Sequence, residues 1–113
     1  MDNKEMYRLL ARKFDEDKPT MPTLANVLLT TANQEYEYQL PRACKRFRVK
    51  TRDGTAFRLA FEKDKVGTAA PSNPYYTVPT NGEYDSKNIR VTELHLYLAC
   101  GVGGKVAEVI SWV

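Results

Sequence analysis

Short segments in which apolar and polar residues alternate recur along the chain from Leu24 onward. Alternation with a period of two gives a segment one buried face and one solvated face, which is typical of strands in an antiparallel sheet. Residues that favour turns, above all Gly, Pro and Asn, separate these segments. The segments that we predict to be strands are 27–31, 35–40, 44–52, 55–61, 75–78, 83–84, 94–99 and 106–112. Six to eight short strands at regular spacing predict a sandwich or a small barrel.

The strongest pattern surrounds the turn signal Asp53-Gly54, where segments 44–52 and 55–61 together predict a β-hairpin. A three-residue loop keeps the apolar side chains on one face and pairs Val49 with Phe57. The apolar face of this hairpin carries Phe47, Val49, Phe57, Leu59 and Phe61. The opposite face carries Arg46, Arg48, Lys50 and Arg58. A second hairpin is expected at the end of the chain, where 94–99 and 106–112 flank a glycine-rich turn.

The beginning of the chain has the period of a helix instead. Its apolar residues recur at spacings of three and four, at Met6, Leu9, Leu10 and Phe14. Asp2 and Glu5 fit a capping box, and Pro19 ends the segment. We therefore expect a helical arm at 1–19 and a sandwich domain at 20–113. The predicted fold is all-β, an antiparallel β-sandwich of jelly-roll-like character with a short N-terminal α-helix. The arm could dock on its own sandwich or on a neighbouring molecule, and both alternatives stay open.

The net charge of +3 is small, but it is unevenly distributed. Residues 42–65 contain nine basic and three acidic residues, a local sum of +6. The predicted hairpin places Arg48 opposite Arg58, a repulsive pair unless an acid lies nearby. Glu35 and Glu37 share one face of the preceding strand and could form a ladder with Arg46 and Arg48. A second interpretation is a docking face for an acidic protein, another copy of the chain included. Nucleic acid is disfavoured, because the aromatic residues lie on the opposite face.

No motif for catalysis, metal binding or a cofactor stands out, so we expect a protein that is not an enzyme and has no cofactor. Cys44 and Cys100 lack C-x-x-C spacing and are expected to be buried free thiols. His95 is the only histidine and has no ligand-like spacing to other residues. No apolar run is long enough to span a membrane, and the first five residues lack the apolar region of a signal peptide, so synthesis in a cytoplasm is expected.

Tyrosine is abundant for a chain of this size, and several of its rings fall on predicted strands. Such rings pack in a core or at its rim, but they are also frequent in protein interfaces and sugar-binding sites. A carbohydrate-binding module would use exposed, coplanar rings as stacking platforms. Its candidate residues are Tyr75, Tyr76, Tyr84 and Trp112.

A series of local motifs gives the chain a resemblance to known proteins. It begins with Thr30-Thr31-Ala32-Asn33 and continues with the segment Phe47 to Ala56, then with Tyr75-Tyr76-Thr77-Val78-Pro79. It ends with the segment from Leu94 to Trp112. Over residues 27–112 the chain resembles small β-sandwich structural proteins of tailed-bacteriophage virions, including head decoration and cement proteins. The resemblance implies a homo-oligomer, with a trimer favoured, that binds the major capsid protein or other virion proteins and catalyses nothing.

The expected function is therefore a structural one in the virion, with assembly in the bacterial host cytoplasm. The basic residues Arg46, Arg48, Lys50 and Arg58 would supply complementarity to acidic partner surfaces. The arm residues Met6, Leu9, Leu10 and Phe14 would supply an apolar anchor. A component of the head–tail or tail connector and a carbohydrate-binding module remain the alternatives.

Overall fold

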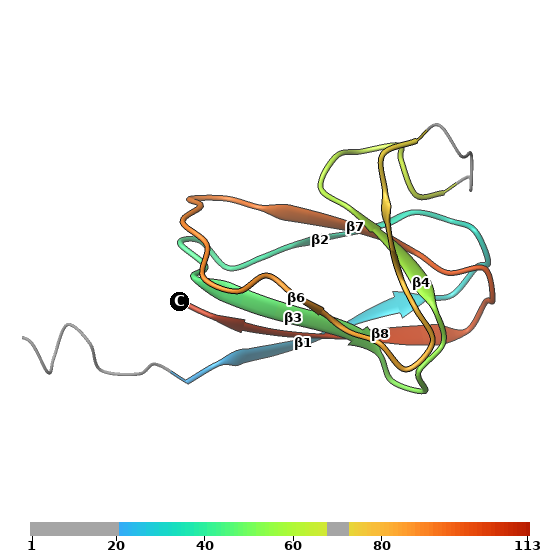
Figure 1. The fold of residues 1–113 in the computed structure, drawn as a ribbon, viewed down its shortest axis with the longest axis horizontal. Coiled ribbons are helices and arrows are strands. Elements are labelled where there is room, and N and C mark those ends of the chain that lie inside the picture. The colour runs from blue at the N-terminus through green and yellow to red at the C-terminus, as the bar shows by residue number, and fades with distance from the viewer. Residues whose placement is uncertain (1–20, 68–72) are drawn as a thin grey trace, which may run out of the picture.

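The computed structural model describes residues 21–67 and 73–113, which form eight strands in two antiparallel sheets. The expected helical arm at 1–19 lies outside these residues. The strands are β1 (Thr23–Leu29), β2 (Tyr36–Gln39), β3 (Arg46–Thr51), β4 (Phe57–Ala60), β5 (Tyr76–Val78), β6 (Tyr84–Asp85), β7 (His95–Ala99) and β8 (Lys105–Trp112). Sheet I has the order β1-β8-β3-β6, and sheet II has the order β2-β7-β4-β5. The all-β sandwich expected from the sequence is confirmed at this level, and Figure 1 shows its two layers.

Consecutive strands lie in opposite sheets everywhere except at β4 and β5. The hairpin predicted around Asp53-Gly54 is therefore wrong: β3 belongs to sheet I and β4 to sheet II. Val49 pairs with Val109 and Tyr84, not with Phe57. The predicted C-terminal hairpin is wrong for the same reason, since β7 lies in sheet II and β8 in sheet I. Each of these turns is an arch that carries the chain from one layer to the other.

The β3–β4 arch is held by its own polar groups. The Asp53 carboxylate accepts hydrogen bonds from the backbone N–H and the hydroxyl of Thr55, at 3.1 and 2.8 Å, and pairs with the ammonium of Lys105 at 2.7 Å. These bonds hold the pKa of Asp53 well below its usual range, with the Lys105 hydrogen bond as the largest cause. Gly54 has a positive φ of 84° and accepts a hydrogen bond from the backbone of Asn81. The Asp-Gly signal thus forms a turn, but one that links two sheets.

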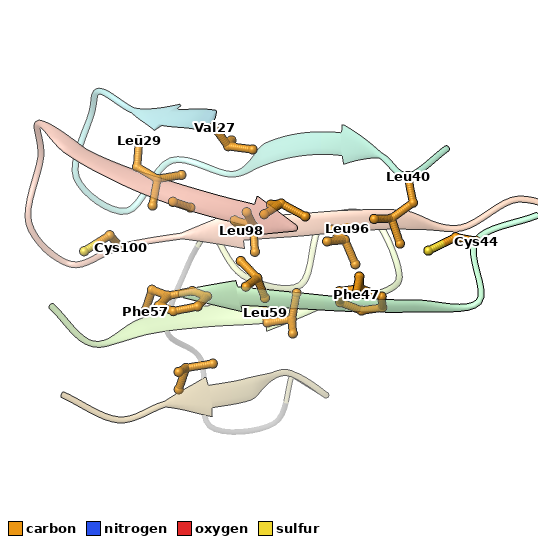
Figure 2. Close-up of a cluster of buried hydrophobic side chains, with 14 residues drawn as sticks. Val27, Leu29, Leu40, Cys44, Phe47, Phe57, Leu59, Leu96, Leu98 and Cys100 are labelled. Carbon is orange, nitrogen blue, oxygen red and sulfur yellow. The ribbon is translucent and has the colours of Figure 1, made fainter. Parts of the chain in front are cut away.

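The core lies between the sheets, where the alternating apolar side chains of both layers meet. Figure 2 shows these side chains pointing toward one another from the two layers. Phe47 on β3 and Phe57 on β4 are its largest members, and both are at most 2% exposed. The outer face of sheet II is covered in part by a smaller cluster in which Val66 packs with Ala60 and Ala99. Pairing thus departs from the prediction. The division into inward and outward positions follows it along β3 and at Phe57 and Leu59 of β4, but the expectation for Phe61 is wrong, because β4 ends at Ala60 and Phe61 is 44% exposed.

Candidate functional site

The outer face of sheet I carries a row of basic side chains from β3. Strand β3 turns Phe47, Val49 and Thr51 inward, where all three are buried. Its alternate positions, Arg46, Arg48 and Lys50, therefore point outward. We call these three the basic row. The sequence placed them together on the polar side of their strand, and the alternation of burial along β3 confirms that placement.

The basic row is balanced by acids of its own sheet. Arg46 donates two hydrogen bonds to the Asp85 carboxylate, at 3.1 and 2.5 Å, and Arg48 forms an ion pair with Glu83. The expected ladder with the glutamates of segment 35–40 is wrong, because β2 lies in the other sheet. The basic row is still neutralised within its own sheet, but by Asp85 on β6 and by Glu83, the residue before β6.

The Arg46–Asp85 pair is the best-defined ion pair of this face. The hydrogen bond from Arg46 is the largest cause that holds the pKa of Asp85 well below its usual range, and the backbone N–H of Lys87 adds a second bond at 2.9 Å. The pair in turn raises the pKa of Arg46. The guanidinium also lies 5.4 Å from the centre of the Trp112 ring, within cation–π range. Arg46 is thus held by several contacts, whereas Lys50, two outward positions further along β3, is exposed.

An open groove of about 500 Å³ lies beside Arg48 and Lys50, two of the three residues of the basic row. One part of its lining is apolar and comes from Leu24 on β1 and Ile110 on β8, which lie opposite each other in the β1–β8 register. The other part is charged and includes Arg48, Lys50, Arg52, Glu83 and Glu108. Such a groove can accept a segment that has an apolar side chain next to charged or polar ones.

Arg58 does not join this site. It lies on β4 in sheet II, where its Nε donates to the carbonyl of Val66 at 2.8 Å and a terminal nitrogen donates to the Asn33 side chain at 2.9 Å. Its guanidinium also lies 6.0 Å from the Tyr75 ring centre. These contacts tie the loop after β4 to the outer face of sheet II. The four basic residues predicted as one interface are therefore divided between two sheets, three on one and one on the other.

The predicted apolar anchor falls outside the described residues. Its members are Met6, Leu9, Leu10 and Phe14. The sequence did not single out the exposed apolar residues of sheet I, where Leu24 is 77% and Leu28 is 61% exposed. The strand was expected to begin at Val27, so Leu24 was placed before it. The pattern Leu24-x-Asn26-x-Leu28, taken as one strand, could have revealed an outer face with two leucines.

The outer face of sheet II has a charged cluster of its own around His95. Its Nδ1 lies 2.5 Å from a carboxylate oxygen of Glu37, and its Nε2 lies 3.2 Å from one of Glu93. These contacts raise the pKa of His95, with Glu37 as the larger cause. The Tyr97 ring stacks beside the imidazole at 6.5 Å. Both ring nitrogens of the histidine thus have a polar partner, on the outer face of a strand that lies inside sheet II.

The candidate stacking rings are arranged at steep angles. Tyr76 on β5 and Tyr84 on β6 have ring centres 5.7 Å apart and planes that meet at 65°. Phe61 lies 6.1 Å from Tyr84 at 60°. The contact between Tyr76 and Tyr84 joins the edge strands β5 and β6 of the two sheets. The guanidinium of Arg46 partly covers the Trp112 ring. Among the described residues, no two of the candidate rings form an exposed, coplanar pair.

Cys44 and Cys100 are buried free thiols, as expected from their spacing. Figure 2 places them at opposite ends of the core. Among residues 21–67 and 73–113, no group of three His, Cys, Asp or Glu side chains could hold a metal ion. Within the same residues, no helix has the length and hydropathy needed to cross a membrane.

Comparisons with known proteins give one structural likeness. No family model matches the chain, and no curated protein matches it. Among solved structures the chain is similar to a de novo designed double-stranded β-helix determined by solution NMR. The match has 16% sequence identity and a TM-score of 0.47, and it covers 83% of this chain and 100% of that chain.

Proposed function

We propose that the protein is a structural component of a tailed-phage virion, of the capsid decoration or cement type, that docks on other virion proteins through the outer face of sheet I. The observation that carries this proposal is the groove in which an apolar wall meets the basic row. Protein interfaces combine apolar anchors with charges that select the partner. The groove has both, on a sheet whose rigid backbone fixes their spacing.

The path of the chain supports a jelly-roll classification, which we include in the proposal. Eight strands in two four-stranded sheets, in the orders β1-β8-β3-β6 and β2-β7-β4-β5, fit the double-sheet jelly roll. Jelly rolls occur in viral capsid proteins and also in lectins and cupins. The fold class thus agrees with a virion role, but the choice among these classes depends on the docking face and on the motifs that resemble phage proteins.

Docking of this kind works through repetition. A single copy contributes a modest interface, and a charged rim alone contributes little affinity in salt. Copies bound side by side on a lattice, or joined to one another, raise the effective concentration of each contact. The complementary partner surface would present an acidic group to Lys50 and an apolar side chain to Leu24 and Ile110.

The test is binding of purified chain to virions of the phage that encodes it, followed by co-sedimentation. Lys50→Glu reverses an exposed charge of the groove and should lower binding at least tenfold. Lys63→Glu is the matched control, because it makes the same change at an exposed position in the loop after β4. Equal binding of both variants and the native chain would refute docking through this face. Loss of binding in both variants would indicate a response to net charge alone, and it would refute the site as well.

The carbohydrate-binding alternative has weaker support from the geometry. Sugar rings stack on flat, exposed aromatic faces, whereas Tyr76 and Tyr84 meet edge to face. Tyr76 is nevertheless 56% exposed. Glycan-array binding that depends on Tyr76 would favour this alternative over docking on protein.

A further inference from the structure

The four edge strands of the sandwich differ in how well they are protected against pairing. An edge strand offers unpaired backbone N–H and C=O groups, and natural proteins protect such edges by short length, charge or proline. β6 has only two residues. β5 has three residues and lies between Pro74 and Pro79. β2 has four residues and carries the exposed Glu37. Three of the four edges are thus protected.

β1 lacks both the short length and the charge that protect other edges, and its one flanking proline, Pro22, lies before its first residue. It is seven residues long, with the sequence Thr-Leu-Ala-Asn-Val-Leu-Leu, and it contains neither a charged residue nor a proline. Within the part of the chain that the structure describes, it pairs only with β8. Its outward side chains are Leu24, Asn26 and Leu28, all of them exposed. Long, uncharged and apolar edges of this kind pair with another strand.

The pattern of β1 is complementary to itself in the antiparallel direction. If two copies of β1 run antiparallel with Asn26 opposite Asn26, then Leu24 of each copy faces Leu28 of the other. Ala25 then faces Val27 on the inner side. Residues that lie directly opposite in an antiparallel pair share a face of the sheet. This register therefore keeps the outer faces of both copies on one side, and a shift by one residue would turn one copy over.

We propose that β1 is a self-pairing edge, through which two copies of the chain join their sheets I into one continuous sheet with Asn26 at the two-fold axis. The partner is a second copy, because the contacts it makes are the same in both directions, as an isologous interface requires. A cyclic trimer would need β1 to pair with a different edge of the next copy, and the other three edges are protected. The geometry thus points to a dimer as the basic unit, in place of the trimer that the resemblance implies.

Pairing through β1 leaves the basic row accessible. Lys50 lies on β3, which is separated from β1 by β8. Two grooves would then lie on the same side of the joined sheet, related by the two-fold axis. This arrangement provides the bivalence from which multivalent docking gains affinity. The pairing itself concerns the free chain and does not depend on a virion partner.

The first test is the solution mass of the full chain by light scattering over a range of concentrations. The expected mass is twice the 12.9 kDa of one chain. The double variant Leu24→Lys and Leu28→Lys places like charges opposite each other twice and should yield monomer. The double variant Leu24→Lys and Leu28→Glu places opposite charges together in the same register and should retain dimer. Val102→Lys, at an exposed apolar residue of the β7–β8 loop, is the matched control and should remain dimeric.

The second test fixes the register by a disulfide. Directly opposite residues of an antiparallel pair have Cα atoms about 4.5–5.5 Å apart, within the range that a disulfide bridges. Asn26→Cys should therefore form a linked dimer on mild oxidation. Lys50→Cys, also exposed but on a central strand, should not. The native cysteines give little background because both are buried.

Several results would overturn the pairing. A full chain that is monomeric or trimeric at every concentration would do so, as would a dimer that the double lysine variant leaves intact. A monomeric Asn26→Cys variant whose introduced thiol resists thiol reagents would show that another part of the same chain covers the edge. These measurements use the free chain and no virion protein. The pairing proposal can therefore be refuted while the docking proposal stands, and the docking proposal can be refuted while the pairing proposal stands.

Discussion

The imidazole of His95 has a carboxylate beside each of its two ring nitrogens. The contacts with Glu37 and Glu93 stabilise the protonated ring and raise its pKa above the ordinary value of 6.5. Tyr97, whose ring stacks beside the imidazole, is neutral between pH 5 and pH 8. A raised pKa means that the folded state holds the proton more tightly than the unfolded state does. The stabilisation is therefore complete below pH 6.5 and is lost as the pH rises through the folded pKa.

A variant with His95→Gln tests this linkage. We expect its free energy of unfolding to lie furthest below that of the native chain near pH 5 and to approach the native value near pH 8. The measurement is chemical denaturation at a series of pH values. Glu37→Gln should weaken the same pH dependence while leaving the imidazole in place. If the variant's free energy of unfolding were lower than that of the native chain by the same amount at every pH, proton binding at His95 would not contribute to stability.

Gly54 and Gly104 allow a second prediction, because both have a left-handed backbone but different surroundings. A Cβ at Gly54 would lie 2.2 Å from the side-chain oxygen of Asn81, whereas a Cβ at Gly104 meets nothing within 4 Å. Gly104→Ala should lower the free energy of unfolding by about 1–2 kcal/mol, from the left-handed conformation alone. Gly54→Ala should lower it further, because Asn81 must also move. Equal losses in denaturation experiments would contradict this, because they would show that the Asn81 side chain moves away without a further loss of free energy.

At the level of strands, the sequence predicted well where the strands lie along the chain, but it predicted poorly which strands pair with each other. The alternation in segments 44–52 and 55–61 correctly assigned Phe47 and Phe57 to the core. It could not identify the neighbouring strand, because two strands joined by a short turn can share a sheet or face each other across a core. In both cases their apolar sides are buried. The choice depends on long-range pairings such as Val49 with Val109, which no local pattern contains.

The central strands should dominate stability, since they pack on both neighbours and on the opposite sheet. Leu98 on β7 is fully buried and pairs with Tyr36 and Leu59. Leu98→Ala should lower the free energy of unfolding by about 2–5 kcal/mol. Val102→Ala, in the exposed loop after β7, should change it by less than about 0.5 kcal/mol. Similar values for both variants would contradict the placement of the core between the two sheets.

For the whole molecule, the candidate site was predictable only where it lies on one strand. Arg46, Arg48 and Lys50 share β3, so alternation alone placed them together. Arg58 was assigned to them through the hairpin that does not form, and the structure moves it to sheet II. The groove was invisible in the sequence, because its apolar wall comes from β1 and β8, which are far apart along the chain but adjacent in sheet I.

The molecule that results has two outer faces of different character. Sheet I offers an amphipathic groove and an unprotected edge at β1, whereas sheet II is partly covered by the loop that Arg58 and Val66 hold in place. A docking protein needs one accessible face with a fixed pattern, and sheet I fits that requirement. The proposed role therefore makes a directional prediction about how the sandwich sits on its partner.

Cryo-electron microscopy of the virion tests this account most directly. We expect density for the sandwich on the particle surface, with the outer face of sheet I and its residue Lys50 against another virion protein. The loop that covers sheet II should then face away from that contact. A sandwich bound through sheet II, or virions that contain no copy of the chain, would contradict the proposed function.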